Sequence, residues 1–166
     1  MKSISLLILS FTFFYISNAQ NPTKEIKVSF LTLRSQLIKK SNATIRLTSY
    51  YDASHIDSSL SKDIKKTASD LVKQLNRNTH FDSSYTQLIA GIIGYLNLLI
   101  SRQEKIALNA NINTTKIKTL RLQLEIIENR IVVLKENYNG LCRKDERLDL
   151  LLNIEAPDDK NSTIEF

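Results

Sequence analysis

The chain has 166 residues with a single cysteine, three glycines and two prolines, and its formal net charge at pH 7 is +6. This length suits one domain of ordinary size. Because Cys142 is the only cysteine, no disulfide can form within the chain, and packing must stabilise the fold. The sequence offers no nucleic-acid motif and no aromatic platform, which disfavours nucleic acid as a partner.

Residues 1–19 have the pattern of a secretory signal peptide. Met1-Lys2 makes a short basic start, Ile4–Ile16 is mostly apolar, and small residues at Ser17 and Ala19 precede Gln20. The apolar run is shorter than the roughly 20 residues that a membrane-spanning helix needs. We therefore predict cleavage before Gln20 and export to the periplasm or the extracellular space. The alternative is an uncleaved membrane anchor formed by residues 1–19.

The first three helices are predicted near residues 24–51, 59–77 and 83–107. The first carries apolar residues and one threonine at spacings of three and four, with Lys40 in a gap of the stripe: Ile26, Phe30, Leu33, Leu37, Thr44, Leu47 and Tyr51. The third is the most apolar, so we expect it at the centre of the fold. No other segment after residue 19 is expected to span a membrane.

Two glycines, Gly91 and Gly94, lie inside the third predicted helix, where each costs up to about 1 kcal/mol in helix propensity compared with alanine. Small residues allow another helix to cross closely, which is the preferred explanation. A ligand cleft beside the glycines is the alternative.

The fourth predicted helix, near residues 114–152, carries the clearest pattern in the chain. Its apolar positions alternate at spacings of three and four before Asp145 interrupts them: Ile117, Leu120, Leu124, Ile127, Ile131, Leu134, Tyr138, Leu141, Leu148 and Leu152. This heptad pattern needs a partner helix along its length. We predict an all-α, extended antiparallel four-helix bundle over residues 20–156, coiled-coil-like, with a long C-terminal helix that could also pair between chains. Pro157 would begin a flexible tail over residues 157–166.

Catalytic chemistry is not indicated by the sequence. His55 and His80 fall in predicted connections, and no metal-ligand motif accompanies them. Glu125 and Glu128 lie one helical turn apart but lack the Glu-x-x-His pattern of metal sites in helical bundles, so contacts such as Glu125 with Arg121 are expected instead. We predict no enzyme activity, no cofactor and no metal. The role of Cys142 stays open between packing beside the heptad stripe, a reactive thiol and an intermolecular bridge.

Positive charge is concentrated in the first half of the exported chain. Residues 20–80 hold 11 Lys/Arg and 5 Asp/Glu, a balance of +6, whereas residues 81–166 have a balance of −1. A basic half could bind an anionic membrane surface or an acidic protein of the cell envelope. Solvated helix faces are the alternative explanation. The lysines selected as candidates for binding are Lys39, Lys40, Lys65 and Lys66.

The run from Leu122 to Ile131, with Glu128-Asn129-Arg130-Ile131 near its end and Tyr138-Asn139 after it, resembles the C-terminal helix of the LemA family. The Tyr85–Asn113 segment is similar to that family's preceding helix and Asn-rich loop, and Arg34–Tyr51 is a fainter match to its first helix. The resemblance implies an extended antiparallel helical bundle outside the cytoplasmic membrane and no catalytic residues. It selects Glu128, Asn129, Arg130, Tyr138 and Asn139 as candidate interaction or structural residues.

Two functions follow as hypotheses. The first is a non-enzymatic exported bundle that acts through contacts with an envelope protein or an anionic membrane surface. The second is a carrier of an apolar small molecule in the bundle core, next to Gly91 and Gly94. The sequence identifies neither the partner nor the oligomeric state.

Overall fold

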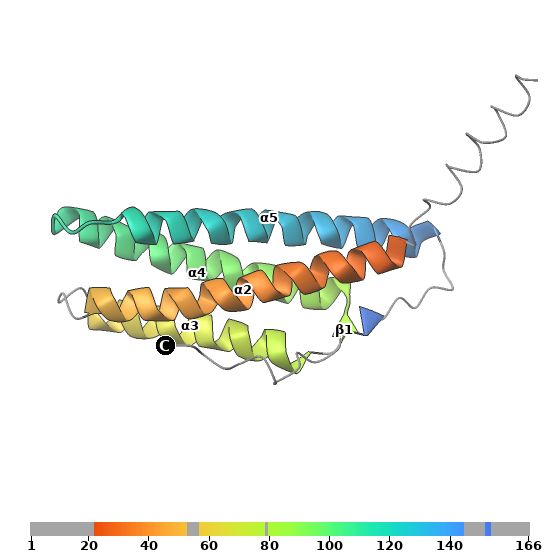
Figure 1. The fold of residues 1–166 in the computed structure, drawn as a ribbon, viewed down its shortest axis with the longest axis horizontal. Helices are drawn as coiled ribbons and strands as arrows, with labels where there is room; N and C mark the ends of the chain where they lie inside the picture. The colour runs from red at the N-terminus through yellow and green to blue at the C-terminus, as the bar shows by residue number, and fades with distance from the viewer. Residues whose placement is uncertain (1–21, 53–56, 79, 145–151, 154–166) are drawn as a thin grey trace, which may run out of the picture.

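The computed structural model describes residues 22–52, 57–78, 80–144 and 152–153 (Figure 1). Within these ranges the chain forms four helices: α2 (Pro22–Asp52), α3 (Ser58–Arg77), α4 (Ser83–Asn109) and α5 (Thr115–Lys144). The prediction of an all-α protein is confirmed for this part of the chain. The predicted signal peptide of residues 1–19 and the predicted tail of residues 157–166 lie outside the described residues.

Polar side chains before three of the helices fix where those helices begin. The carboxylate of Asp57 accepts hydrogen bonds from the backbone N–H groups of Ser59 and Leu60 at the start of α3. Asp82 accepts one from Tyr85 N at 2.6 Å at the start of α4, and the side chain of Asn113 accepts one from Thr115 N before α5. Each bond satisfies a backbone donor that has no partner within its own helix.

The four helices lie side by side along the long axis of the molecule (Figure 1). Helix α2 packs against α3 and α5, and α4 packs against the same two helices. The predicted central position of α4 is therefore wrong, and its side chains Leu88, Tyr95 and Leu98 are exposed. The high apolar content of α4 reflects the absence of charged residues from 83–101. It does not mean that other helices cover α4 on all sides, since some of its apolar side chains are exposed.

By length and composition α4 could cross a membrane, so the expectation that no further segment meets that test is also wrong. The residues that α4 buries against its neighbours, such as Ile89, Ile93 and Leu96, are those of a core helix. Such a helix in a water-soluble fold passes the same composition test.

The heptad stripe predicted for the last helix is buried along α5. Its members are at most 8% exposed from the first turn of α5 to near its end: Ile117, Leu120, Leu124, Ile127, Ile131, Leu134 and Tyr138. Leu141 is partly buried and packs against the same core. The alternating spacing thus identified the face that α5 turns toward its partners.

The stripe predicted for α2 is buried except at one position. Leu47 is only partly buried, whereas the other six members are buried as expected: Ile26, Phe30, Leu33, Leu37, Thr44 and Tyr51. Three hydroxyl residues continue the core in the second half: Ser41, Thr44 and Thr48. The hydroxyls of Thr44 and Thr48 donate to the carbonyl oxygens of Lys40 and Thr44, four residues earlier, at 2.9 and 2.7 Å. These bonds remove most of the cost of burying a hydroxyl.

Two short strands complete the described structure. β1 (His80–Phe81), between α3 and α4, pairs antiparallel with β2 (Leu152–Asn153), so that His80 lies opposite Asn153 and Phe81 opposite Leu152. The prediction that the last helix reaches Leu152 is therefore wrong, because Leu152 is in a strand. Strands of two residues are too short to show the alternating pattern by which strands are recognised in a sequence. The Phe81 ring is buried, with its centroid 4.5 Å from that of Phe30.

Candidate functional site between helices α2 and α5

Glu128 is a half-buried carboxylate at the contact between α4 and α5. Its Oε2 accepts a hydrogen bond from Asn97 Nδ2 at 3.1 Å. Its Oε1 would lie only 3.0 Å from a Cβ atom added to Gly94, so the glycine leaves room for the carboxylate. Gly94 therefore permits a close approach between helices, as preferred from the sequence.

Gly91 is exposed and has open space where a Cβ atom would be. It lines a surface hollow of about 440 Å³ between α3 and α4, together with Leu88, Ile92 and Tyr95. A ligand cleft beside the two glycines was the alternative explanation from the sequence. At Gly91 this space is a hollow on the molecular surface. At Gly94 the adjacent space is occupied by Glu128.

Tyr138 and Asn139 lie near the end of α5. The Tyr138 ring is 8% exposed and makes an edge-to-face contact with Phe81, with 5.5 Å between ring centroids. Such a contact stabilises a core beyond the area that it buries. Tyr138 is thus a packing residue, and Asn139 beside it is half-buried.

Asn129 and Arg130 line a groove of about 510 Å³ between α2 and α5, which we call the Arg130 groove. Both are exposed residues, and Ser29, Thr32 and Val133 are among the others that line it. The described residues that line this groove include no Asp or Glu that could pair with Arg130.

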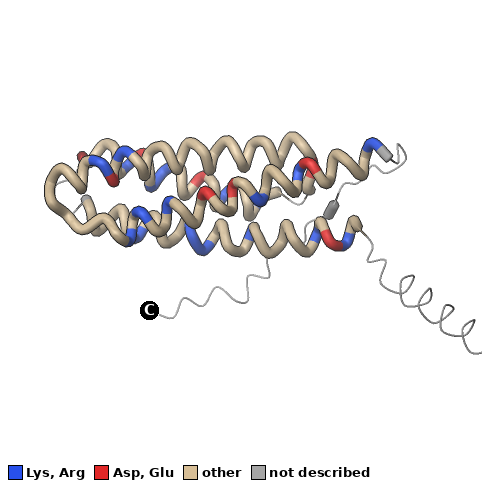
Figure 2. Tube along the Cα trace, turned by 90° about the horizontal axis from the view of Figure 1, so that it is seen from above, with Lys and Arg blue, Asp and Glu red and all other residues tan. Residues whose placement is uncertain are grey.

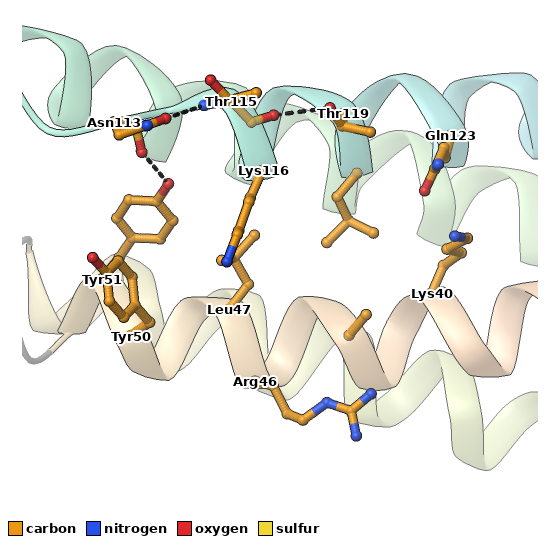
Figure 3. A pocket seen from close by; sticks show the side chains of 12 residues that line it. Lys40, Arg46, Leu47, Tyr50, Tyr51, Asn113, Thr115, Lys116, Thr119 and Gln123 are labelled. Atoms are coloured by element: carbon orange, nitrogen blue, oxygen red, sulfur yellow. Dashed lines mark hydrogen bonds between the residues drawn. The ribbon is translucent and has the colours of Figure 1, made fainter.

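Lys40 lines a larger groove between the same two helices, of about 880 Å³, which we call the Lys40 groove (Figure 3). Its apolar lining comes from Ala43 and Leu47 of α2 and Leu120 of α5. Figure 3 shows Lys116 reaching from α5 toward Leu47 of α2, and Lys40 lying near Gln123 farther along the groove.

Three cations and no carboxylate are found among the described residues that line the Lys40 groove: Lys40, Arg46 and Lys116. Figure 3 shows the Arg46 side chain directed away from α5, so the two lysines are the cations nearest the space between the helices. Tyr51 closes the end of the groove, because its hydroxyl donates to the carbonyl oxygen of Asn113 at 2.7 Å. Burial raises the pKa of Tyr51, and nearby Tyr50 and Glu104 raise it further.

The sequence had selected only Lys40 of this groove. The contributions of Lys116, Leu120 and Gln123 could not be predicted because they depend on how α5 lies along α2. A helical spacing does connect the α2 members, since Lys40, Ala43, Leu47 and Tyr50 follow one another at intervals of three and four.

The remaining candidate lysines lie on α2 and α3. Lys39 on α2 and Lys66 on α3 are exposed, whereas Lys65 on α3 is half-buried. Exposed Arg46 on α2 and Lys62 on α3 lie on the same two neighbouring helices. We call these five residues, together with half-buried Lys40 of α2, the basic face. Figure 2 shows Lys and Arg residues spaced along α2, the helix that continues into the grey trace of residues 1–21.

A cation that the sequence did not single out lies inside the fold. Arg34 is only 4% exposed, and its burial lowers the pKa of the guanidinium, an effect that nearby Tyr85 opposes. Burial in turn raises the pKa of Tyr85, while a hydrogen bond from Asn78 and the charge of Arg34 act in the opposite direction. The signal available in the sequence was the position of Arg34, four residues after the core residue Phe30.

The expected contact between Glu125 and Arg121 is confirmed, with 3.7 Å between Oε2 and Nη1. Arg121 Nε also donates to Glu104 of α4 at 3.0 Å, which links the two helices. Across the residues that the structure describes, no group of three or more His, Cys, Asp or Glu side chains is placed to hold a metal ion.

Comparison with known proteins gives no match to a family model, to a curated protein or to a solved structure.

Proposed function

We propose that this protein is an exported, non-enzymatic, antiparallel four-helix bundle that binds an anionic membrane surface in the bacterial cell envelope through its basic face. The export pattern of residues 1–19 and the resemblance to the LemA family support the location. The antiparallel arrangement is supported by the contacts Asn97–Glu128 and Glu104–Arg121, because residue numbers rise along α4 as they fall along α5.

The observation that carries the proposed function is the charge of α2 and α3. Residues 20–80, which contain both helices, have a balance of +6, and four members of the basic face are exposed: Lys39, Arg46, Lys62 and Lys66. A lysine or arginine near an anionic leaflet contributes about 1 kcal/mol of attraction. A few such residues on two neighbouring helices therefore suffice for reversible binding.

A charge-reversal variant tests this proposal. Changing Lys39, Lys40, Lys65 and Lys66 together to Glu removes about 4 kcal/mol of attraction, which is roughly a thousandfold in affinity. We expect binding to vesicles that contain anionic lipid to be lost, while the helical circular dichroism signal is retained. Vesicles of neutral lipid should bind neither protein.

The matched control reverses four exposed cations on the other two helices: Arg102, Lys105, Lys118 and Arg143. This variant has the same net charge as the first, so equal loss of binding in both would show that total charge matters and that the basic face does not. If the unaltered protein bound an acidic envelope protein but not anionic vesicles, the partner would be a protein and not the membrane surface.

A carrier of an apolar small molecule remains the second candidate. Its proposed location next to Gly94 now has less support, because Glu128 lies against that glycine. Native mass spectrometry of the purified protein would test it. A ligand that co-purifies with several preparations would favour a carrier, and repeated absence of one would count against it.

A further inference from the structure

We propose that the Lys40 groove binds a single anionic amphiphile of the fatty-acid class, with its carboxylate at Lys116 and its alkyl chain along the apolar lining toward Lys40. The site shares only Lys40 and Arg46 with the basic face, and the proposed carboxylate position at Lys116 lies outside that face. The proposal therefore does not depend on membrane binding.

The lining of the groove combines the two chemistries that an anionic amphiphile requires. Ala43, Leu47 and Leu120 line the groove and present apolar surface that would be covered by an alkyl chain. The lysines supply positive charge, and the described lining residues contain no acid that would neutralise it. A small inorganic anion would leave the apolar surface uncovered, and a neutral hydrocarbon would not use the lysines.

The Lys116 end is the better position for the carboxylate. Lys116 is the second residue of α5, so the positive end of the helix dipole is added to its ammonium group there. Thr115 also lines this part of the groove, and its backbone N–H is bonded to the side-chain oxygen of Asn113. At the other end, the methylene groups of Lys40 can cover the end of the alkyl chain while the ammonium group stays in water.

The dimensions of the groove fit such a ligand. Its volume of about 880 Å³ lies within the range of small-molecule sites. Lys116 lies beside Leu47 (Figure 3), so the part of the groove between the two lysines follows α2 from Lys40 to Leu47, which corresponds to about 10 Å of helix at 1.5 Å per residue. The end of a medium-length acyl chain would therefore lie against the side chain of Lys40.

The first experiment measures binding of dodecanoate, below its micelle concentration, to the purified full chain by isothermal titration calorimetry. Dodecanol, which has the same chain and a neutral head, should bind at least about tenfold more weakly, because it cannot pair with Lys116. Acetate, which has the carboxylate without the chain, should not bind measurably. Equal affinities for dodecanoate and dodecanol would overturn the proposal.

Two pairs of variants locate the site. Lys116→Glu should weaken dodecanoate binding by about tenfold or more, whereas Lys118→Glu, an exposed residue of α5 outside the groove, should not. Ala43→Phe should block the apolar lining while Val28→Phe, an exposed position of α2 outside this groove, leaves binding intact. Equal effects within both pairs would place the ligand elsewhere.

The acidic segment of residues 154–166 is the competing occupant of the groove, since it carries four Asp/Glu and one Lys. A chain that ends at Asn153 distinguishes the two. Binding of dodecanoate to both the full and the shortened chain supports the proposal. Binding of dodecanoate to the shortened chain alone would show that residues 154–166 occupy the groove in the full chain. The proposal would then be wrong.

Discussion

At the scale of single residues, the two glycines of α4 differ in what surrounds them. A methyl group at Gly91 would enter open space, whereas one at Gly94 would lie 3.0 Å from the Glu128 carboxylate. Both positions cost helix stability in the same way, because glycine loses more backbone freedom than alanine on folding. Only at Gly94 does the structure offer a contact that offsets this cost.

We therefore expect Gly91→Ala to raise the free energy of unfolding by about 1 kcal/mol. Gly94→Ala should gain clearly less or lose stability, because Glu128 must move and its bond to Asn97 is disturbed. In a Glu128→Ala background, Gly94→Ala should gain as much as Gly91→Ala does. Urea denaturation measures all four variants, and an equal gain at both glycines in the parent chain would contradict the role assigned to Gly94.

The sequence could place Gly94 inside a helix and suggest a close crossing, but it could not identify Glu128 as the group that uses the space. That assignment requires the alignment of α5 along α4. Tyr138 was easier to predict, because its place in the heptad stripe fixes it on the buried side of α5 whatever the partner. Arg34 was harder, since a charged residue on a helix is ordinarily exposed.

At the scale of secondary-structure elements, α2 consists of two different halves. The first half buries large apolar side chains, and the second buries Ser41, Thr44 and Thr48, together with Tyr51 one residue before the helix ends at Asp52. The periodicity predicted the helix, the apolar half and the burial of Thr44 and Tyr51 correctly. It was wrong at Leu47, because Leu47 and Thr48 are neighbours and the apolar one was assigned to the core. The structure places Thr48 there, where its hydroxyl is satisfied within the helix.

Tyr51 ties the end of α2 to the residues before α5 through its bond to the Asn113 carbonyl oxygen. We expect Tyr51→Phe to lower the free energy of unfolding at neutral pH by about 1 kcal/mol, because the carbonyl loses its donor. Tyr95→Phe, at an exposed ring on α4, is the matched control and should change it little.

The same tyrosine affects stability at high pH. Burial raises the pKa of Tyr51 in the folded protein above its unfolded value of about 10. Its contribution is therefore complete below about pH 10 and is lost as the pH rises through the folded pKa. Chemical denaturation across this range should show a smaller alkaline loss for Tyr51→Phe than for the parent. An identical alkaline loss would argue against burial of this hydroxyl.

At the scale of the whole molecule, charge is divided into three blocks. Residues 20–80 have a balance of +6, and residues 81–144, with nine Lys/Arg and five Asp/Glu, have +4. Residues 145–166 hold two Lys/Arg and seven Asp/Glu, a balance of −5. Residues 81–166, which together have a charge balance of −1, thus combine a basic pair of helices with an acidic segment.

Removal of residues 154–166 takes away a net charge of −3 and leaves the described helices unchanged. If the basic face binds an anionic membrane, the shortened chain should bind anionic vesicles more tightly, with a steeper dependence on salt concentration. Sedimentation with vesicles at two salt concentrations measures both effects. Weaker binding by the shortened chain would indicate that the acidic segment takes part in the contact.

The overall architecture was largely predictable, because four amphipathic segments with short connections can bury their apolar stripes only against one another. The grooves were not. They form where side chains of α2 and α5 fail to fill the space between the helices, and that depends on the sizes of facing residues such as Ala43 and Leu120. The strand pair could not be predicted from the sequence for another reason, because it joins residues that are far apart in the chain.

The contact of Glu128 with Gly94 also restricts how far α5 could slide along α4. An apolar stripe repeated every heptad would meet apolar partners again after a slip of seven residues. A slip in one direction would bring Glu128 beside Glu104, where two carboxylates repel. In the other direction, Glu128 would face Gln87 and Ala90, which offer neither the glycine gap nor the Asn97 amide. A polar contact of modest strength therefore selects one alignment among several that the apolar residues alone would accept.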